Sequence, residues 1–167
     1  MSTAFIICGP PGAGKTTYGS RLAAERQAVL LDIDTVTETM VRAALSAAGR
    51  DPNDRDSPWF KTHFREPIYD TLFAIAKENL PVQDVVIVGP FTREIRDATW
   101  PGKLVERLGS PVKIHYVTCP PEVRRQRIIT RGEPRDLAKL ADWDSHQAYF
   151  RNEGPPVFEH VFIDTGC

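Results

Sequence analysis

Short apolar runs alternate along this chain with segments in which apolar residues recur every three or four positions. The runs predict buried strands, and the segments predict helices that pack one face against a core. Strands that alternate with helices form a parallel sheet through right-handed crossovers. We therefore expect a single three-layer α/β domain over residues 1–167, with a five-stranded parallel sheet flanked by helices. The strands are expected at residues 4–8, 28–34, 84–89, 112–117 and 157–163.

The helices between these strands are marked by signals at their ends. Residues 35–38 have the capping-box form, which predicts that a helix begins there and ends before Gly49. The next helix is expected from near Pro67 to residue 80, and residues 59–64 either extend it or form a separate turn. The remaining helices are expected at residues 15–27, from near Pro101 to Gly109, at 121–131 and at 143–151.

Between the first strand and the first helix lies Gly9-Pro-Pro-Gly-Ala-Gly-Lys-Thr16, which matches the phosphate-binding pattern G-x-x-x-x-G-K-[ST]. Its glycines let the backbone N–H groups point at phosphate oxygens, and the following helix N-terminus adds a positive dipole. Lys15 is expected to reach the β- and γ-phosphates of a nucleoside triphosphate, and the Thr16 hydroxyl to coordinate Mg²⁺. The nucleotide-binding residues expected in this loop are Gly9, Pro10, Pro11, Gly12, Ala13, Gly14, Lys15, Thr16 and Thr17.

The composition is that of an ordinary globular protein, with 41% hydrophobic and 26% charged residues. A net charge of −1 does not show the positive excess that is typical of proteins that bind long nucleic acids, and it argues against a nucleic-acid partner. Cys8, Cys119 and Cys167 have no framework spacing, and we interpret the first two as core thiols at strand ends in a reducing compartment. With no room for a signal peptide and no membrane-length apolar run, we expect a cytoplasmic monomer or dimer without a membrane partner.

Two carboxylates end the second predicted strand, in the sequence Leu31-Asp-Ile-Asp34. Ligands of open α/β sheets bind beyond the carboxyl ends of the strands. Asp34 is expected to be the last residue before the helix, and we favour it over Asp32. It would accept the proton of an acceptor hydroxyl or hold a water on Mg²⁺. The alternative for both residues is an ordinary helix cap.

Arginines gather after the fourth predicted strand. Arg124, Arg127 and Arg131 share one helix face by their spacing, and Arg135 follows on a charged segment, residues 132–142, that is expected to form a small lid. Phosphoryl transfer needs donors around the migrating group, and a guanidinium offers a planar fork to its oxygens. The alternative is a solvated basic helix paired with nearby carboxylates.

With these residues in hand, the whole chain resembles the small P-loop kinases of the nucleoside-monophosphate-kinase-like group. It is similar to the compact set that includes chloramphenicol phosphotransferase, the zeta toxins and the kinase domain of phage polynucleotide kinase. The resemblance implies a P-loop NTPase fold with a lid, and it implies ATP and Mg²⁺. It also implies that Asp34 is the base, that Arg127 and Arg131 hold the nucleotide and its phosphates, and that Arg135 acts from the lid. The last strand and its loop, Asp164-Thr-Gly166, would approach the adenine through Thr165.

The chain departs from the family pattern at its third strand, which ends in Val86-Ile-Val-Gly89 without the aspartate that many P-loop enzymes use for Mg²⁺. Magnesium would then depend on Thr16, the phosphates and Asp32 or Asp34, and we assign Thr16 and Asp34 as the metal residues. The acceptor-side segments, residues 50–66 and 90–100, match no substrate signature. The candidate acceptor contacts in them are Arg65, Arg93 and Glu94.

The sequence thus predicts an ATP-dependent phosphotransferase that moves the γ-phosphoryl group to a hydroxyl of a small-molecule acceptor. One alternative is a kinase of a nucleic-acid end, which needs a basic groove beside Asp34. Another is a nucleotide-binding ATPase switch, which acts through a protein partner and needs an apolar docking patch. A cavity beside Asp34 lined by residues 50–65 and 90–100 would favour the small-molecule kinase.

Overall fold

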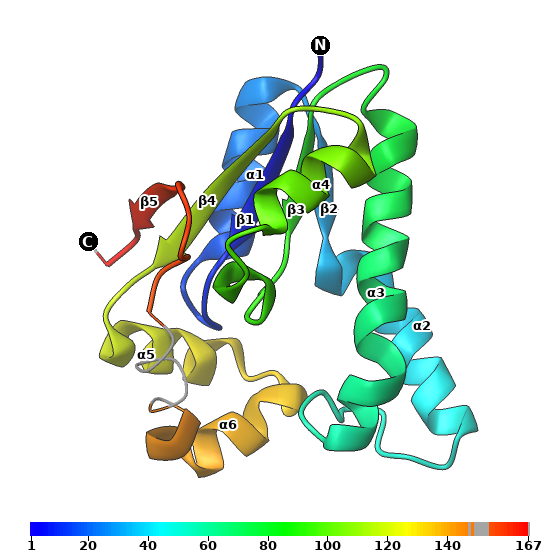
Figure 1. Cartoon of the computed structure of the whole chain (residues 1–167). Helices are drawn as coiled ribbons and strands as arrows, with labels where there is room; N and C mark the ends of the chain where they lie inside the picture. Colours follow the sequence, from blue (N-terminus) through cyan, green and yellow to red (C-terminus); the bar gives the residue numbers. More distant parts are fainter. Residues whose placement is uncertain (147, 149–153, 167) are drawn as a thin grey trace.

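The computed structural model describes residues 1–146, 148 and 154–166, and within them five strands form one parallel sheet in the order β2-β3-β1-β4-β5 (Figure 1). Every neighbouring pair runs parallel, with Ala4 of β1 opposite both Val85 of β3 and Val112 of β4. The predicted α/β sheet architecture is confirmed. The strands are β1 (Ala4–Cys8), β2 (Val29–Asp32), β3 (Val85–Val88), β4 (Val112–Thr118) and β5 (Val161–Asp164).

Helices cover both faces of this sheet, as Figure 1 shows. Phe5 and Ile7 of β1 pack with Leu22 of α1 on one face, whereas Ala4 and Ile6 belong to the larger core under α3 and α4 on the other. All of β1 is buried, which explains why its sequence is a continuous apolar run instead of an alternating one. The helices are α1 (Lys15–Arg26), α2 (Ile33–Ala47), α3 (Pro58–Asn79), α4 (Trp100–Leu108), α5 (Pro121–Arg131) and α6 (Leu137–Ala141), with 3₁₀ turns η1 (Glu94–Arg96) and η2 (Pro134–Asp136).

The start of α2 differs from the prediction. The helix begins at Ile33, because the Asp32 carboxylate accepts a hydrogen bond from the Asp34 N–H at 2.9 Å and caps the helix directly at the end of β2. The predicted capping box at residues 35–38 is therefore wrong. The prediction that Asp34 is the last residue before the helix is also wrong, since Asp34 lies in its first turn.

The start of α3 also differs from the prediction near Pro67. The Ser57 hydroxyl caps the helix by accepting from the Phe60 N–H at 3.0 Å, and Pro58 fits the first turn, where no N–H partner is needed. Residues 59–64 therefore extend the helix, and Pro67 lies inside it. Phe60 joins Val41 and Leu45 of α2 in a small separate core, which holds the long N-terminal half of α3 beside α2 below the sheet (Figure 1).

The C-terminal third of the chain follows its prediction in part. Val161 is the first residue of β5 to pair with β4, because Val157 bonds instead to the Ile95 carbonyl, so the last strand is shorter than expected. Residues 143–146 and 148 are helical, and the rest of the predicted helix over 143–151 lies outside the described residues.

The predicted core thiols are buried. Cys8 is 0% and Cys119 is 6% exposed, both are unbridged, and Cys167 lies outside the described residues. Across the described ranges, no helix is long and apolar enough to cross a membrane.

Candidate active site

The phosphate loop, residues 9–16, is pressed against β4 and α5. Gly9 and Gly12 have φ angles of 138° and 76°, and a Cβ atom would lie 2.0 Å from the Val117 carbonyl oxygen at Gly9 and 2.7 Å from the Arg124 carbonyl oxygen at Gly12. Only glycine fits both the conformation and the space. Gly14 begins α1 without a side-chain cap, so the first N–H groups of the helix are open to an anion.

Lys15 extends along this loop. Its Nζ donates to the Pro10 carbonyl at 2.9 Å. Burial lowers the pKa of Lys15 to about 8, although the nearby carboxylate of Asp34 opposes that shift. The ammonium group is thus partly desolvated and has no carboxylate within salt-bridge distance among the described residues. Such a cation gains much by meeting a phosphate.

Thr16 pairs with Asp32. The Thr16 hydroxyl donates to one carboxylate oxygen of Asp32 at 2.7 Å, and the other oxygen of Asp32 caps α2. Asp32 is 5% exposed and has both oxygens engaged. The sequence favours Asp34 as the carboxylate beside Thr16, but the structure puts Asp32 there. The reason is that α2 starts earlier than predicted, so Asp34 lies in the first turn of the helix and its side chain pairs with Arg135.

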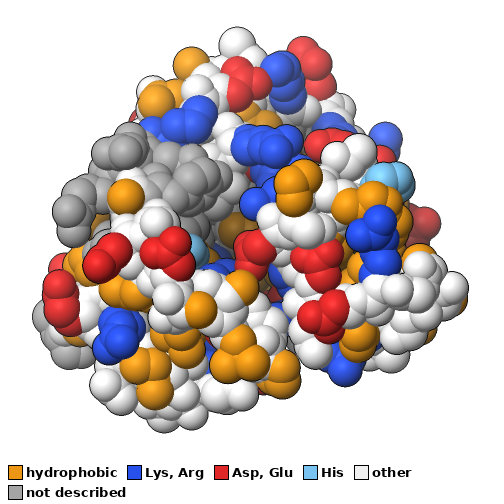
Figure 2. All heavy atoms as spheres, turned by 90° about the horizontal axis from the view of Figure 1, so that it is seen from below, with side chains coloured by type: hydrophobic (Ala, Val, Ile, Leu, Met, Phe, Trp, Pro, Cys, Tyr) orange, Lys and Arg blue, Asp and Glu red, His pale blue; other side chains and the backbone are white. Residues whose placement is uncertain are grey.

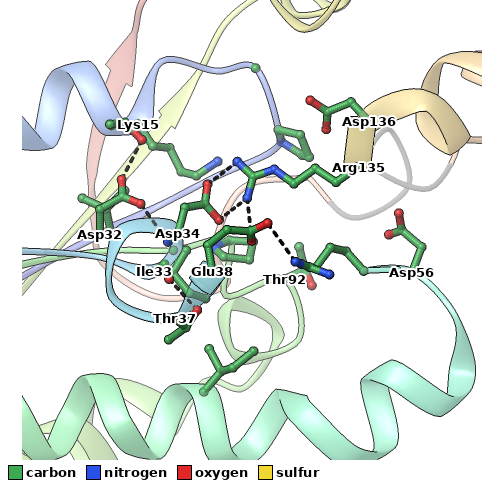
Figure 3. Close-up of a pocket in the computed structure, with 18 of the residues that line it drawn as sticks. Lys15, Asp32, Ile33, Asp34, Thr37, Glu38, Asp56, Thr92, Arg135 and Asp136 are labelled. Carbon is green, nitrogen blue, oxygen red and sulfur yellow. Dashed lines mark hydrogen bonds and ion pairs between the residues drawn. The ribbon is translucent and has the colours of Figure 1, made fainter. Parts of the chain in front are cut away.

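Asp34 faces residues 132–142 instead, the segment that the sequence predicts to be a lid and that is called the lid below (Figure 3). Arg135 makes two contacts of 2.8 Å with the two carboxylate oxygens of Asp34, and its Nη1 lies 3.3 Å from a Glu38 oxygen. Burial alone would lower the pKa of Arg135, but the hydrogen bond and charge of Asp34, with Glu38, raise it above its usual value. Glu38 also accepts from Arg55 at 2.8 Å, so one carboxylate joins the lid to the loop before α3.

A second set of ion pairs holds the lid. Asp136 is 1% exposed, and its carboxylate pairs with Arg131 at 2.6 Å and with Lys139 at 3.4 Å. These cations, with their hydrogen bonds, hold the pKa of Asp136 below its usual value despite burial. Lys139 also reaches Asp56 at 3.3 Å, which gives a further link between the lid and the loop before α3.

Arg127 ties the last strand to the phosphate loop. It donates to the hydroxyl of Thr165 at 2.9 Å and to the Thr165 carbonyl at 2.7 Å. The Thr165 hydroxyl in turn donates to the Ala13 carbonyl at 2.6 Å. Arg124, on the same predicted helix face, is only 5% exposed and does not line the cavity described next, so the three arginines do not act as one surface.

On the predicted acceptor side, α3 contacts the segment after β3. Arg65 donates to both carboxylate oxygens of Glu94, at 2.8 and 2.7 Å. Arg65 also lies over the ring of Tyr69, 5.1 Å from its centre, and Tyr69 is 5% exposed. The candidate contacts Arg65 and Glu94 therefore neutralise each other.

Most of these groups surround one cavity of about 670 Å³. It is lined by the phosphate loop, α2, the first half of α3, the segment after β3, α5 and the lid. In Figure 2, seen from below, positive and negative side chains face one another around a hollow in this face. The cavity beside Asp34 that would favour a small-molecule kinase is present. From the two predicted acceptor-side segments its lining includes Arg55, Asp56, Phe60, Lys61, Arg65, Pro90, Thr92 and Arg93. The predicted site residues that line it are Pro11, Gly12, Gly14, Lys15, Thr16, Thr17, Asp34, Arg127, Arg131 and Arg135.

The other predicted nucleotide residues lie behind this lining. Gly9, Pro10 and Ala13 are the buried residues of the loop, and Thr165 contacts Ala13 from the position directly after β5. Several lining residues are missed by the sequence motifs. A signal exists for Glu38, because it shares a helix face with Asp34 at i, i+4 spacing. No local signal marks Arg55, Asp56, Lys61 or Lys139, which are ordinary surface charges in sequence terms.

Comparison with known proteins identifies the family. Residues 5–152 match the family model AAA_33, described as an AAA domain. The chain belongs to this family. An adenylate kinase of Deinococcus radiodurans is 33% identical over 132 residues, which are 76% of this chain and 63% of that protein, so the match spans less than two thirds of the relative.

Solved structures agree on the fold. A sugar kinase from Janibacter sp. HTCC2649 superposes with a TM-score of 0.61 at 18% identity, over 98% of this chain and 86% of the other. A gluconokinase from Sinorhizobium meliloti 1021 gives 0.55 at 15% identity, over 97% and 81%. At these identities the likeness establishes the fold, which is that of the small P-loop kinases.

Proposed function

We propose that this protein is an ATP-dependent phosphotransferase that moves the γ-phosphoryl group to a hydroxyl of a small molecule. One observation carries the proposal: a single cavity joins the phosphate loop to a partly exposed carboxylate, Asp34, and to the acceptor-side segments. The adenylate kinase relative and the family support the same reaction type.

Lys15 and the open N–H groups at the start of α1 bind the β- and γ-phosphates in this proposal. Arg127 and Arg131 line the cavity from α5 and supply charge next to the transferring group. Thr165, directly after β5, supports the loop through Ala13 and approaches the adenine, as the family resemblance implies.

Thr16 and Asp32 suit Mg²⁺, because a hydroxyl and a carboxylate are hard oxygen ligands and lie 2.7 Å apart. We propose that they hold the ion, Asp32 through water, in place of the aspartate that β3 lacks. Mg²⁺ would neutralise charge that builds up on the phosphates during transfer. The assignment of Asp34 to the metal stays a prediction, and its contacts favour a role as base.

Asp34 takes the acceptor proton. Its side chain is 49% exposed and ion-paired to Arg135, whose departure frees the carboxylate for the hydroxyl. The acceptor oxygen then attacks the γ-phosphorus as its proton passes to Asp34, the bond to the β-γ bridging oxygen breaks, and ADP leaves. Arg135, once released, is free to pair with the transferring phosphoryl group.

The test is ADP release from ATP and Mg²⁺ across a panel of sugars, nucleosides, aminoglycosides and other hydroxyl compounds, with Asp34→Asn beside the wild type. We expect one class to stimulate turnover and the variant to lose roughly 10²–10⁴-fold in kcat while still binding ATP. Slow hydrolysis that no acceptor and no substitution at Asp34 changes would overturn the proposal and favour an ATPase switch.

A further inference from the structure

The cavity is more positive than the chain around it. Its lining contains nine lysines and arginines against five aspartates and glutamates, whereas the whole chain has a net charge of −1. Clefts lined by one sign of charge concentrate ligands of the other sign. Part of the excess serves the nucleotide, because Lys15 and Arg127 lie on or next to the phosphate loop.

Most of the other cations in the lining are matched. Arg131, Arg135 and Lys139 bind carboxylates of α2 and the lid, Arg55 binds Glu38, and Arg65 binds Glu94. Two remain. Within the described ranges, Lys61 and Arg93 line the cavity and make no salt bridge.

These two cations belong to the same wall. Lys61 lies one helical turn before Arg65 on α3, so both project from one face of that helix. Arg93 directly precedes Glu94, and Glu94 is bonded to Arg65 by two hydrogen bonds. The Arg65–Glu94 pair therefore fixes α3 beside the segment after β3, and these are the two elements that bring Lys61 and Arg93 to the cavity.

From this arrangement we propose that the acceptor carries an anionic group, a carboxylate or a phosphate, in addition to the hydroxyl that is phosphorylated. Lys61 and Arg93 bind the anionic group, and the hydroxyl lies toward Asp34 on the α2 side. Ile68, Tyr69 and Val41 line the same cavity and offer apolar surface to a compact carbon skeleton. This inference rests on the proposed kinase function and names its substrate class.

The opposite wall agrees with this orientation. Its carboxylates, Asp34 and Glu38, pair with Arg135 and Arg55, and Arg135, once released, goes to the transferring phosphoryl group, so neither arginine is left for a second anionic group. An acceptor bound the other way round would set its anion against two carboxylates, which is unfavourable. Charge therefore orients the acceptor as well as selecting it.

The experiment fractionates small molecules from an extract of the cells that produce the protein by anion exchange at neutral pH. Each fraction is mixed with the protein, Mg²⁺ and ATP labelled at the γ-phosphate, and label in new compounds is measured. We expect the acceptor in the retained, anionic fractions. Phosphatase treatment of those fractions before the assay then separates the two sources, since a phosphate ester loses the activity and a carboxylate keeps it.

Variants tie the result to the two side chains. Arg93→Gln and Lys61→Gln should each raise KM for the retained acceptor by roughly tenfold, with KM for ATP unchanged. Lys77→Gln is the matched control, because Lys77 is exposed on the same helix and does not line the cavity. An acceptor found only in the unretained fraction, or KM values equal to those of the control, would overturn the inference and leave the kinase intact. No labelled product from any fraction would overturn the kinase proposal itself.

Discussion

At the predicted nucleotide end of the cavity the backbone of one continuous loop is backed by α5, whereas at the predicted acceptor end side chains meet from α2, the loop before α3, α3 itself and the lid. The loop is held by backbone geometry that only glycine permits at Gly9 and Gly12. The acceptor end is held by ion pairs, among them Arg135 with Asp34 and Arg55 with Glu38. The nucleotide end is thus fixed by the backbone conformation of a single segment. The acceptor end is held by ion pairs whose charged groups can exchange partners.

The two ends of the cavity also differ in how much free energy it costs to rearrange them. A glycine replaced where a Cβ meets a carbonyl oxygen forces the backbone to move. Partly exposed ion pairs each contribute only about 0.2–1 kcal/mol and weaken in salt. We therefore expect the nucleotide end to stay preformed and the acceptor end to rearrange when ligands bind.

The largest effect is expected at the fixed end. Lys15→Ala removes the cation next to the phosphates and should reduce kcat/KM for ATP on the order of 10²–10³-fold, the range for loss of one preorganised donor. Steady-state kinetics measure it, with circular dichroism to check folding. ATP turnover close to that of the wild type would mean that the loop does not bind phosphate as proposed.

The next prediction concerns pH at the same residue. Because burial lowers the pKa of Lys15 to about 8, its proton is lost in the free protein as pH rises through that value. ATP binds the charged form, so its Kd should rise roughly tenfold between pH 7 and pH 9. Lys15→Arg stays charged over this range and should give a flat profile. Titration of a fluorescent ATP analogue distinguishes the two, and a flat wild-type profile contradicts the prediction.

A smaller change tests the boundary between the two ends. Asp32→Ala removes both the cap of α2 and the partner of Thr16, and should lower the free energy of unfolding by about 1–2 kcal/mol. It should also raise the Mg²⁺ concentration needed for turnover. Thr35→Ala is the control, since Thr35 does not cap the helix. Denaturant unfolding and Mg²⁺ titration measure the two effects, and equal results for both variants would remove the role given to Asp32.

The smallest effect is expected at the movable end. Glu38→Gln releases Arg135 and Arg55 from their shared carboxylate, so the lid should open more readily and acceptor-independent ATP hydrolysis should rise a few-fold. Wild-type hydrolysis should rise toward the variant's rate at high salt. Glu66→Gln, an exposed glutamate on α3, serves as control. If hydrolysis by the Glu38 variant is unchanged at every salt concentration, the ion pairs do not hold the lid.

The elements that follow from local pattern could be predicted from the sequence. The apolar runs predict all of the strands, and β1 has the predicted bounds. The starts of α2 and α3 were predicted too late, because each helix has more than one candidate start signal in the sequence and the pattern alone does not select between them. Asp32, and not Thr35, caps α2. Ser57 caps α3, whose start was expected near Pro67.

The phosphate loop was determined by the sequence alone, because its residues are contiguous and their chemistry depends on backbone conformation. The partners of those residues were decided by the tertiary structure. Thr16 meets Asp32 because the end of β2 approaches the start of α1 in the folded sheet, and Arg135 meets Glu38 across 97 positions of sequence. Charges pair by distance in space, and that distance exists only once the strands have taken their order and α3 has packed against α2.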